Sequence, residues 1–223
     1  ETLCMTSYKC IGALKAGYWK AFAEFLIDCS NAFQATRTDG RGAEDGSQLP
    51  ASAPIHCWPA PGFERRSASG ERMVCKVNVG MQGRIDATRL FNTNLFRILL
   101  QRANMTRLVW DKQVAVFHNG PGIGTVMSLA ETLVAIRDAT DTAAQDEPIG
   151  YAVIGFHVDD GLGVACSVGW CRDYKANRVI QFIVGTIEIT YACTLTGWHG
   201  YKSLGYTLTL DETLHVVNMS AME

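Results

Sequence analysis

The stretch GYAVIGFHVDDGLGVACS, residues 150–167, decides the fold of this chain. Residues 151–158 are apolar and rich in β-forming side chains, and residues 162–166 are small and apolar, so both runs predict buried strands. Between them lies Asp-Asp-Gly, which is typical of a tight hairpin turn. The adjacent carboxylates of Asp159 and Asp160 are therefore either ordinary turn residues or ligands that hold a metal ion at the tip of a hairpin.

The composition is that of a folded protein. The chain has 223 residues, of which 48% are hydrophobic and 19% charged, and this excludes a disordered chain and allows a sizeable core. A formal net charge of −2 excludes a protein that is basic throughout. Lys and Arg nevertheless outnumber Asp and Glu between Glu64 and Lys112, so this segment either faces phosphates or is an ordinary solvated surface.

The eight cysteines indicate the cellular compartment of the protein rather than a metal site. No C-x-x-C pair and no cluster of His residues accompanies them, which argues against bound zinc. Free, mostly buried thiols in a reducing compartment are the simplest interpretation, and this predicts an intracellular protein of the cytoplasm or nucleus. No apolar run reaches the length of a membrane span. The chain begins without Met, which suggests a piece of a longer protein.

Periodicity predicts a mixture of helices and strands. Helices are expected over residues 6–20, 86–102, 128–139 and 174–189. Strands are expected over residues 23–27, 73–79, 108–110, 114–117, 151–158 and 162–166, and on both sides of Asp211 and Glu212. Residues 35–54 are rich in Gly, Ser, Thr and Ala and indicate a loop or insertion. This order predicts an α+β fold with a mainly antiparallel sheet.

A third carboxylate ends a predicted strand. Asp28 follows the apolar run at residues 23–27, just as Asp159 follows the run at residues 151–158. Two such acids can meet if their strands are neighbours in one sheet. Carboxylates without His or Cys suit Mg²⁺ or Mn²⁺, and paired Mg²⁺ ions stabilise the attacking and leaving oxygens of phosphoryl transfer.

Five blocks of sequence resemble the copia-type reverse transcriptases of long-terminal-repeat retrotransposons, and they occur in the order of that family. The blocks are FLIDCSNAF (25–33), PAPGFE (59–64), VCKVNVGMQ (74–82), FHVDDGLGVACS (156–167) and SLGYTLTLDE (203–212). The resemblance implies the palm of a right-handed polymerase, with partial fingers and the start of the thumb. Residues 1–223 would form a single reverse-transcriptase domain of palm type, with a fingers-like insertion at residues 35–72 and the palm end and primer grip at residues 174–223.

The resemblance also implies a catalytic centre. Asp28, Asp159 and Asp160 would be the catalytic carboxylates and the ligands of Mg²⁺ or Mn²⁺. Asp28 and Asp159 would bridge both ions, and Asp160 would support the second less directly. His157 would contact substrate near the end of the primer, at a position where the family has Tyr.

Four further residues would contact substrates by the same resemblance. Phe33 would exclude a ribose 2′-hydroxyl, although it could equally be a core aromatic residue. Gln82 would lie near the incoming nucleotide, although it could equally be a polar surface residue. Leu204 and Gly205 would belong to the segment that grips the primer.

The implied activity is that of an RNA-dependent DNA polymerase, which transfers a nucleotide from a dNTP to a primer 3′-hydroxyl. Its partners would be an RNA or DNA primer–template, dNTPs, and the rest of a retroelement polyprotein or a larger assembly. One alternative is a non-catalytic, retroelement-derived structural subunit, against which the three intact aspartates argue. Another is a palm-fold nucleotidyl cyclase, which fits two aspartates but does not fit the primer-grip-like tail.

Overall fold

A computed structural model describes the chain over residues 18–36, 55–81, 86–140, 147–198, 201–203, 206–211 and 216–221. The chain divides into two compact units. The first unit combines residues 1–30 with residues 96–223, and the second consists of residues 31–95. Most of the helix expected at residues 6–20 lies outside the described residues, and its end, Tyr18–Ala21, is a short 3₁₀ helix, η1.

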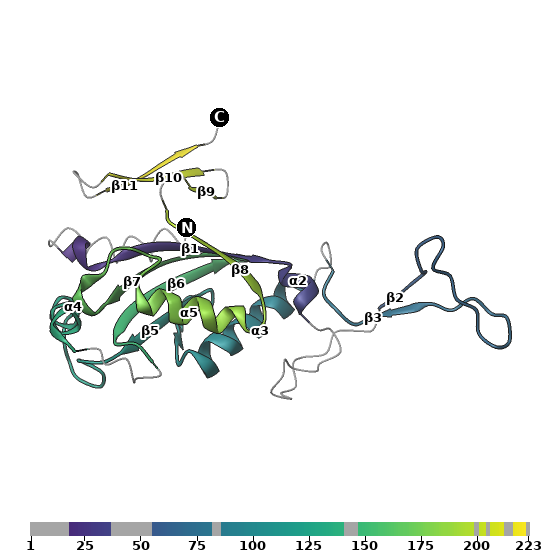
Figure 1. The fold of residues 1–223 in the computed structure, drawn as a ribbon, viewed down its shortest axis with the longest axis horizontal. Coiled ribbons are helices and arrows are strands. Elements are labelled where there is room, and N and C mark those ends of the chain that lie inside the picture. Colours follow the sequence, from purple (N-terminus) through teal and green to yellow (C-terminus); the bar gives the residue numbers. More distant parts are fainter. Residues whose placement is uncertain are drawn as a thin grey trace. The chain divides into compact units, whose positions relative to one another are not determined.

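The first unit contains a six-stranded antiparallel sheet (Figure 1). In spatial order its strands are β4 (Thr106–Arg107), β5 (Val114–Asn119), β6 (Gly150–His157), β7 (Asp160–Ser167), β1 (Ala23–Ser30) and β8 (Ala192–Thr196). Each neighbouring pair is antiparallel. The expected α+β fold with a mainly antiparallel sheet is therefore confirmed.

Three α-helices accompany the strands of this unit in the part of the chain that the structure describes. They are α3 (Ala87–Arg102, which begins in the second unit), α4 (Leu129–Asp138) and α5 (Arg178–Glu188), with a short 3₁₀ helix η2 (Val168–Trp170) after β7. Taken without the elements that lie between them in the chain, β1, α3, β6, β7, α5 and β8 follow a β-α-β-β-α-β order, and their strands lie in the order β8-β1-β7-β6. Within this pattern β1 and β7 are the two central strands, so residues at their ends are held from both sides.

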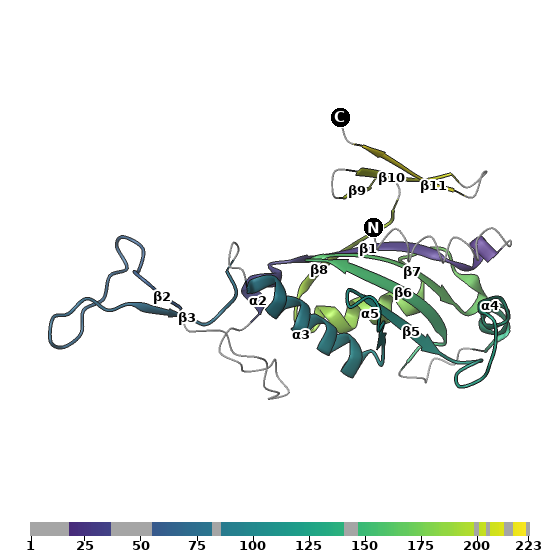
Figure 2. The ribbon, with the colours of Figure 1, turned by 180° about the vertical axis from the view of Figure 1, so that it is seen from behind.

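Helices cover the sheet differently on its two faces. On one face Phe96 of α3 packs against Phe156 with ring centroids 6.0 Å apart, and Phe182 of α5 packs against Phe117 at 5.7 Å. On the other face α4 contributes Leu133 to a core cluster that also contains buried side chains of the sheet: Leu26, Val114, Val153, Val164 and Cys166. We call these the α3/α5 face and the α4 face, and Figures 1 and 2 show the ribbons from opposite sides.

Side-chain caps set the first residues of two helices. The Ser128 hydroxyl accepts a hydrogen bond from the backbone N–H of Glu131, whose carboxylate accepts one in return from the backbone of Ser128. Asn177 Oδ1 accepts hydrogen bonds from the backbone N–H groups of Val179 and Ile180. This cap explains why α5 starts at Arg178, four residues later than the helix expected at 174.

The second unit contains the short helix α2 (Ala32–Ala35) and a two-stranded hairpin. Its strands β2 (Ile55–Cys57) and β3 (Cys75–Val77) pair antiparallel, so the strand expected at residues 73–79 is present but shorter.

The first unit also contains a separate three-stranded sheet, formed by β9 (Tyr201–Ser203), β10 (Tyr206–Asp211) and β11 (Val216–Ala221). The last two confirm the strands expected around Asp211. Among the described residues, none of the helices is both long and apolar enough to cross a bilayer.

Candidate active site at the β6–β7 turn

The hairpin expected at residues 151–166 is confirmed, but its turn consists of other residues than the sequence suggested. His157 pairs with Asp160, so the two central turn residues are Val158 and Asp159, while Asp160 and Gly161 already belong to β7. Gly161 is needed for packing, because a Cβ atom there would lie 2.7 Å from the Phe156 ring. The Asp-Asp-Gly sequence thus predicts the hairpin correctly, but only its first Asp lies in the turn.

The turn is strained at Val158. This residue has a φ of +57°, a left-handed conformation that is uncommon for residues other than Gly and unfavourable for a β-branched side chain. Such conformations persist where the surrounding structure enforces them, and they gather at functional sites. Here the strained residue immediately precedes Asp159, so the turn holds that carboxylate at the tip of the hairpin.

Val158→Gly should raise the free energy of unfolding by up to about 1 kcal/mol, because Gly removes the strain although it gains freedom in the unfolded chain. Urea denaturation of the two proteins measures the difference. Asn104 is the matched control, since it also has a positive φ (49°) but Asn tolerates that conformation. Asn104→Gly should therefore stabilise less than Val158→Gly. An equal or larger gain at Asn104 would show that Val158 is not strained.

A row of polar residues crosses the sheet beside this turn. The register pairs His157 with Asp160, Asp160 with Asp28, and Asp28 with Thr194, across β6, β7, β1 and β8. Residues directly opposite each other in neighbouring strands share a face of the sheet. Asp28 lies two residues after Leu26, and side chains two apart in a strand point to the same face, so this row lies on the α4 face with Leu26. His157, Asp28 and Thr194 are exposed and Asp160 is half-buried. We call these four residues the polar row.

The backbone ties Asp159 to the polar row. The backbone N–H of Cys29 donates a hydrogen bond to the carbonyl oxygen of Asp159 at 3.1 Å, which fixes the turn beside the end of β1. The pKa of the Cys29 thiol is raised above its usual range, first by a hydrogen bond with Cys193, then by burial, and then by the charges of Cys193, Asp28 and Asp159. The charges of Asp28 and Asp159 thus both act on the Cys29 thiol at this end of the sheet.

The donor set fits Mg²⁺ or Mn²⁺ better than it fits a softer ion. Carboxylate oxygens are the ligands that these hard cations prefer, and Asp28, Asp159 and Asp160 carry such oxygens on two neighbouring strands and their turn. Within the described ranges no group of three His, Cys, Asp or Glu side chains is arranged as metal ligands. A complete set is not required, because Mg²⁺ is usually held by one or two carboxylates together with substrate phosphates.

Of the remaining predicted site residues, the structure describes Phe33. Phe33 lies in α2 of the second unit, where its half-buried ring packs edge-to-face against Phe91, with centroids 6.2 Å apart. Gln82, Leu204 and Gly205 lie outside the described residues, so their predicted roles stay predictions.

Sequence reasoning missed two residues of the site. Thr194 joins the polar row through β8, a strand that the sequence did not predict. In Ala192–Thr196 the apolar residues Cys193 and Leu195 alternate with small or polar residues, which is a weak strand signal in a run of five. The strain at Val158 depends on the register of the hairpin and has no signal in the sequence.

Comparison with known proteins does not assign this site. No family model, curated protein or solved structure matches the chain.

Proposed function

We propose that this chain is the palm of an RNA-dependent DNA polymerase, which transfers a nucleotide from a dNTP to a primer 3′-hydroxyl. The observation that carries the proposal is the register that pairs Asp28 with Asp160 on the two central strands, with Asp159 in the adjoining turn. These are the three carboxylates that the resemblance to copia-type reverse transcriptases selects from the sequence. The strand order of the sheet supports the proposal, since it makes the carboxylate-bearing strands β1 and β7 neighbours.

The proposed chemistry divides between the metal ions and the chain. Bound Mg²⁺ or Mn²⁺ supplies the positive charge that neutralises the attacking and leaving oxygens of the transfer. Asp28 and Asp159 would hold these ions, and Asp160 would add negative charge from the neighbouring position in β7. The work of the protein is then to place the reacting groups in line, which alone lowers a barrier substantially.

The neighbours of the carboxylates can contact nucleic acid. His157 and Thr194 are exposed at the two ends of the polar row, and both side chains can donate hydrogen bonds to phosphate or sugar oxygens. A primer end that lies along the polar row would thus meet donors on both sides of the carboxylates. This arrangement supports a substrate-contacting role for His157 although the family has Tyr there.

The hairpin of the second unit supports a nucleic-acid partner independently. Four cations are exposed along it: Arg65, Arg66, Arg72 and Lys76. The guanidinium of Arg72 lies over the ring of Trp58, 5.1 Å from its centroid, and 61% of Trp58 is exposed. Exposed cations with an accessible aromatic ring are the combination that binds phosphates and stacks on bases. The basic segment predicted from the sequence is therefore accessible in this part of the chain.

Primer extension tests the proposed function. The purified chain is incubated with a labelled DNA primer on an RNA template, dNTPs and Mg²⁺ or Mn²⁺. We expect this chain by itself to extend the primer poorly, with addition that follows the template sequence and requires the metal ion. A folded chain that binds primer–template but adds no nucleotide would instead favour the structural subunit, and a cyclic nucleotide product would favour the cyclase.

Phe33→Val should raise the incorporation of ribonucleotides relative to deoxyribonucleotides. In the proposed function the ring excludes a 2′-hydroxyl by shape, and its contact with Phe91 keeps the ring rigid. Discrimination by shape alone is modest, so we expect a change of roughly 10- to 200-fold in the ratio of the two kcat/KM values. Single-nucleotide incorporation measures that ratio. An unchanged ratio together with lower stability would assign Phe33 to core packing alone.

A further inference from the structure

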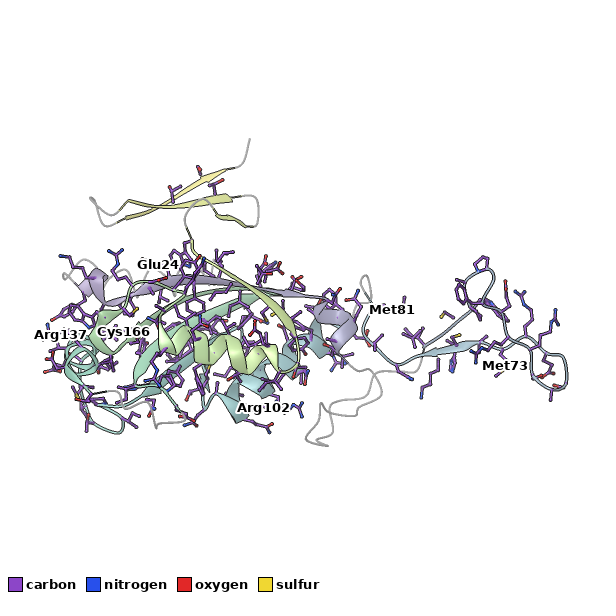
Figure 3. All side chains as sticks on the ribbon, in the orientation of Figure 1. Glu24, Met73, Met81, Arg102, Arg137 and Cys166 are labelled. Carbon is purple, nitrogen blue, oxygen red and sulfur yellow. The ribbon has the colours of Figure 1, made fainter. Side chains whose placement is uncertain are left out.

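Two cysteines face each other on the exposed hairpin of the second unit. The register pairs Cys57 of β2 directly with Cys75 of β3. Both are free thiols, and both are exposed, so the expectation of mostly buried cysteines is wrong for this hairpin. Figure 3 shows the side chains along this segment, with Met73 labelled next to β3. Because directly opposed residues of antiparallel strands share a face, the two thiols project to the same side.

The backbone at this pair is compatible with a disulfide. Directly opposed residues of antiparallel strands have Cα atoms about 4.5–5.5 Å apart, and disulfides span Cα separations of about 4.4–6.8 Å. The Cα separation expected for this register therefore lies within the range that a disulfide spans. It would close the loop that contains the Arg66–Arg72 bridge and the turn in which Gly70 N–H donates to the Ser67 carbonyl.

A second opposed pair in the first unit shows by contrast which thiols can react. Cys29 and Cys193 are also register partners, and their sulfur atoms lie 3.7 Å apart. Cys29 is buried, however, and the hydrogen bond with Cys193 and burial raise its thiol pKa above the usual range. Burial also raises the pKa of the Cys166 thiol to about 12. Thiol oxidation needs an accessible thiolate, so these buried cysteines are protected and the hairpin pair is accessible.

We propose that Cys57 and Cys75 form a thiol–disulfide modification site that reacts with low-molecular-weight disulfides such as oxidised glutathione. The thiolate of one cysteine attacks the small disulfide, forms a mixed disulfide and releases one thiol after protonation. The second cysteine then attacks the protein sulfur of the mixed disulfide and releases the second thiol. The protein loses two hydrogen atoms in total, and the small disulfide is reduced to two thiols.

The surroundings of the pair favour this reagent. Oxidised glutathione carries several carboxylates, and the exposed cations Arg65, Arg66, Arg72 and Lys76 lie on the same hairpin. Since β2 and β3 each have only three residues, few backbone contacts hold their register, and the covalent bond would fix it. The modification therefore fixes the register of the hairpin that carries these cations. This effect does not depend on the reaction that the first unit performs.

Tryptic mapping of the full chain tests this site. The protein is equilibrated with oxidised and reduced glutathione, remaining thiols are alkylated, and the chain is digested without reduction. Trypsin cuts after Arg65, Arg66 and Arg72, which all lie between the two cysteines, and after Lys76. We expect one cross-linked species that joins the peptide containing Cys57 to Met73–Lys76, which contains Cys75, and that disappears on reduction.

Single substitutions make the result specific. Cys57→Ser and Cys75→Ser should each abolish the cross-linked species and leave glutathione on the remaining cysteine. Cys166→Ser, which removes a buried thiol, should leave the cross-link unchanged. Cross-links that join Cys57 or Cys75 to other cysteines, or stable glutathione adducts on both in the unsubstituted chain, would overturn the proposal. Primer extension does not enter this test, so its outcome is independent of the proposed polymerase activity.

Discussion

Asp159→Asn should lower the rate of nucleotide addition by about 10³-fold or more while the protein stays folded. A bound metal ion stabilises the transition state of phosphoryl transfer by several kcal/mol, and each 1.36 kcal/mol corresponds to about tenfold in rate. Asp159 lies in a two-residue turn and is half-buried, so its loss should change the free energy of unfolding by roughly 1 kcal/mol or less. Single-turnover primer extension and urea denaturation measure the two effects separately.

Two further variants decide whether the loss is specific. Asp28→Asn should have an effect of similar size, because Asp28 lies opposite Asp160 on the neighbouring strand. Asp138→Asn is the matched control, since Asp138 is an exposed carboxylate of the same unit that pairs with Arg137 in α4. It should leave primer extension unchanged. Full activity in Asp159→Asn would remove the hairpin from any catalytic mechanism, and an equal loss in Asp138→Asn would show that the effect is not specific to the site.

Gly163→Ala should destabilise the first unit by about 1–3 kcal/mol. A Cβ atom at Gly163 would lie 2.4 Å from the ring of Phe25, whose side chain is 0% exposed and cannot move into solvent. The added methyl group must therefore push the ring or separate β1 from β7. For a chain of this size the loss corresponds to a fall of several degrees in Tm, which differential scanning calorimetry measures.

Gly185 provides a control of opposite sign. It lies inside α5, is exposed, and a Cβ atom there would meet nothing within 4 Å. Gly185→Ala should therefore stabilise the protein by about 0.5–1 kcal/mol, because Ala loses less backbone freedom than Gly in a helix. Phe25→Leu in the Gly163→Ala background should restore part of the lost stability. If Gly163→Ala is neutral, then Gly163 does not pack against Phe25 as described.

Local patterns in the sequence were sufficient for most individual elements. The amphipathic run at residues 86–102 predicted α3 almost to its ends, and the run at residues 128–139 predicted α4. The apolar runs around Asp159 predicted β6 and β7 as a hairpin. These elements are determined by contacts between residues close in sequence, namely periodic apolar positions and side-chain caps, so neighbouring residues suffice to predict them.

One strand that the sequence did not predict, β8, depends on its partner. β8 is short and only half-buried, and it forms because β1 offers it a free edge to pair with. Strand propensity is weak where a strand lies at the edge of a sheet, so its own residues carried too little signal. The same dependence explains Gly161, which sequence reasoning assigned to the turn and which the structure places against Phe156.

By itself the sequence determined the fold class, the hairpin and the identity of three candidate carboxylates. The tertiary structure alone decided which residues stand opposite each other. Three pairs stand opposite each other only because of the observed strand registers: Asp28 and Asp160, Asp28 and Thr194, and Cys57 and Cys75. The physical reason is that a shift of one residue in a strand moves every side chain to the other face, and the correct register is selected by burial across the whole sheet.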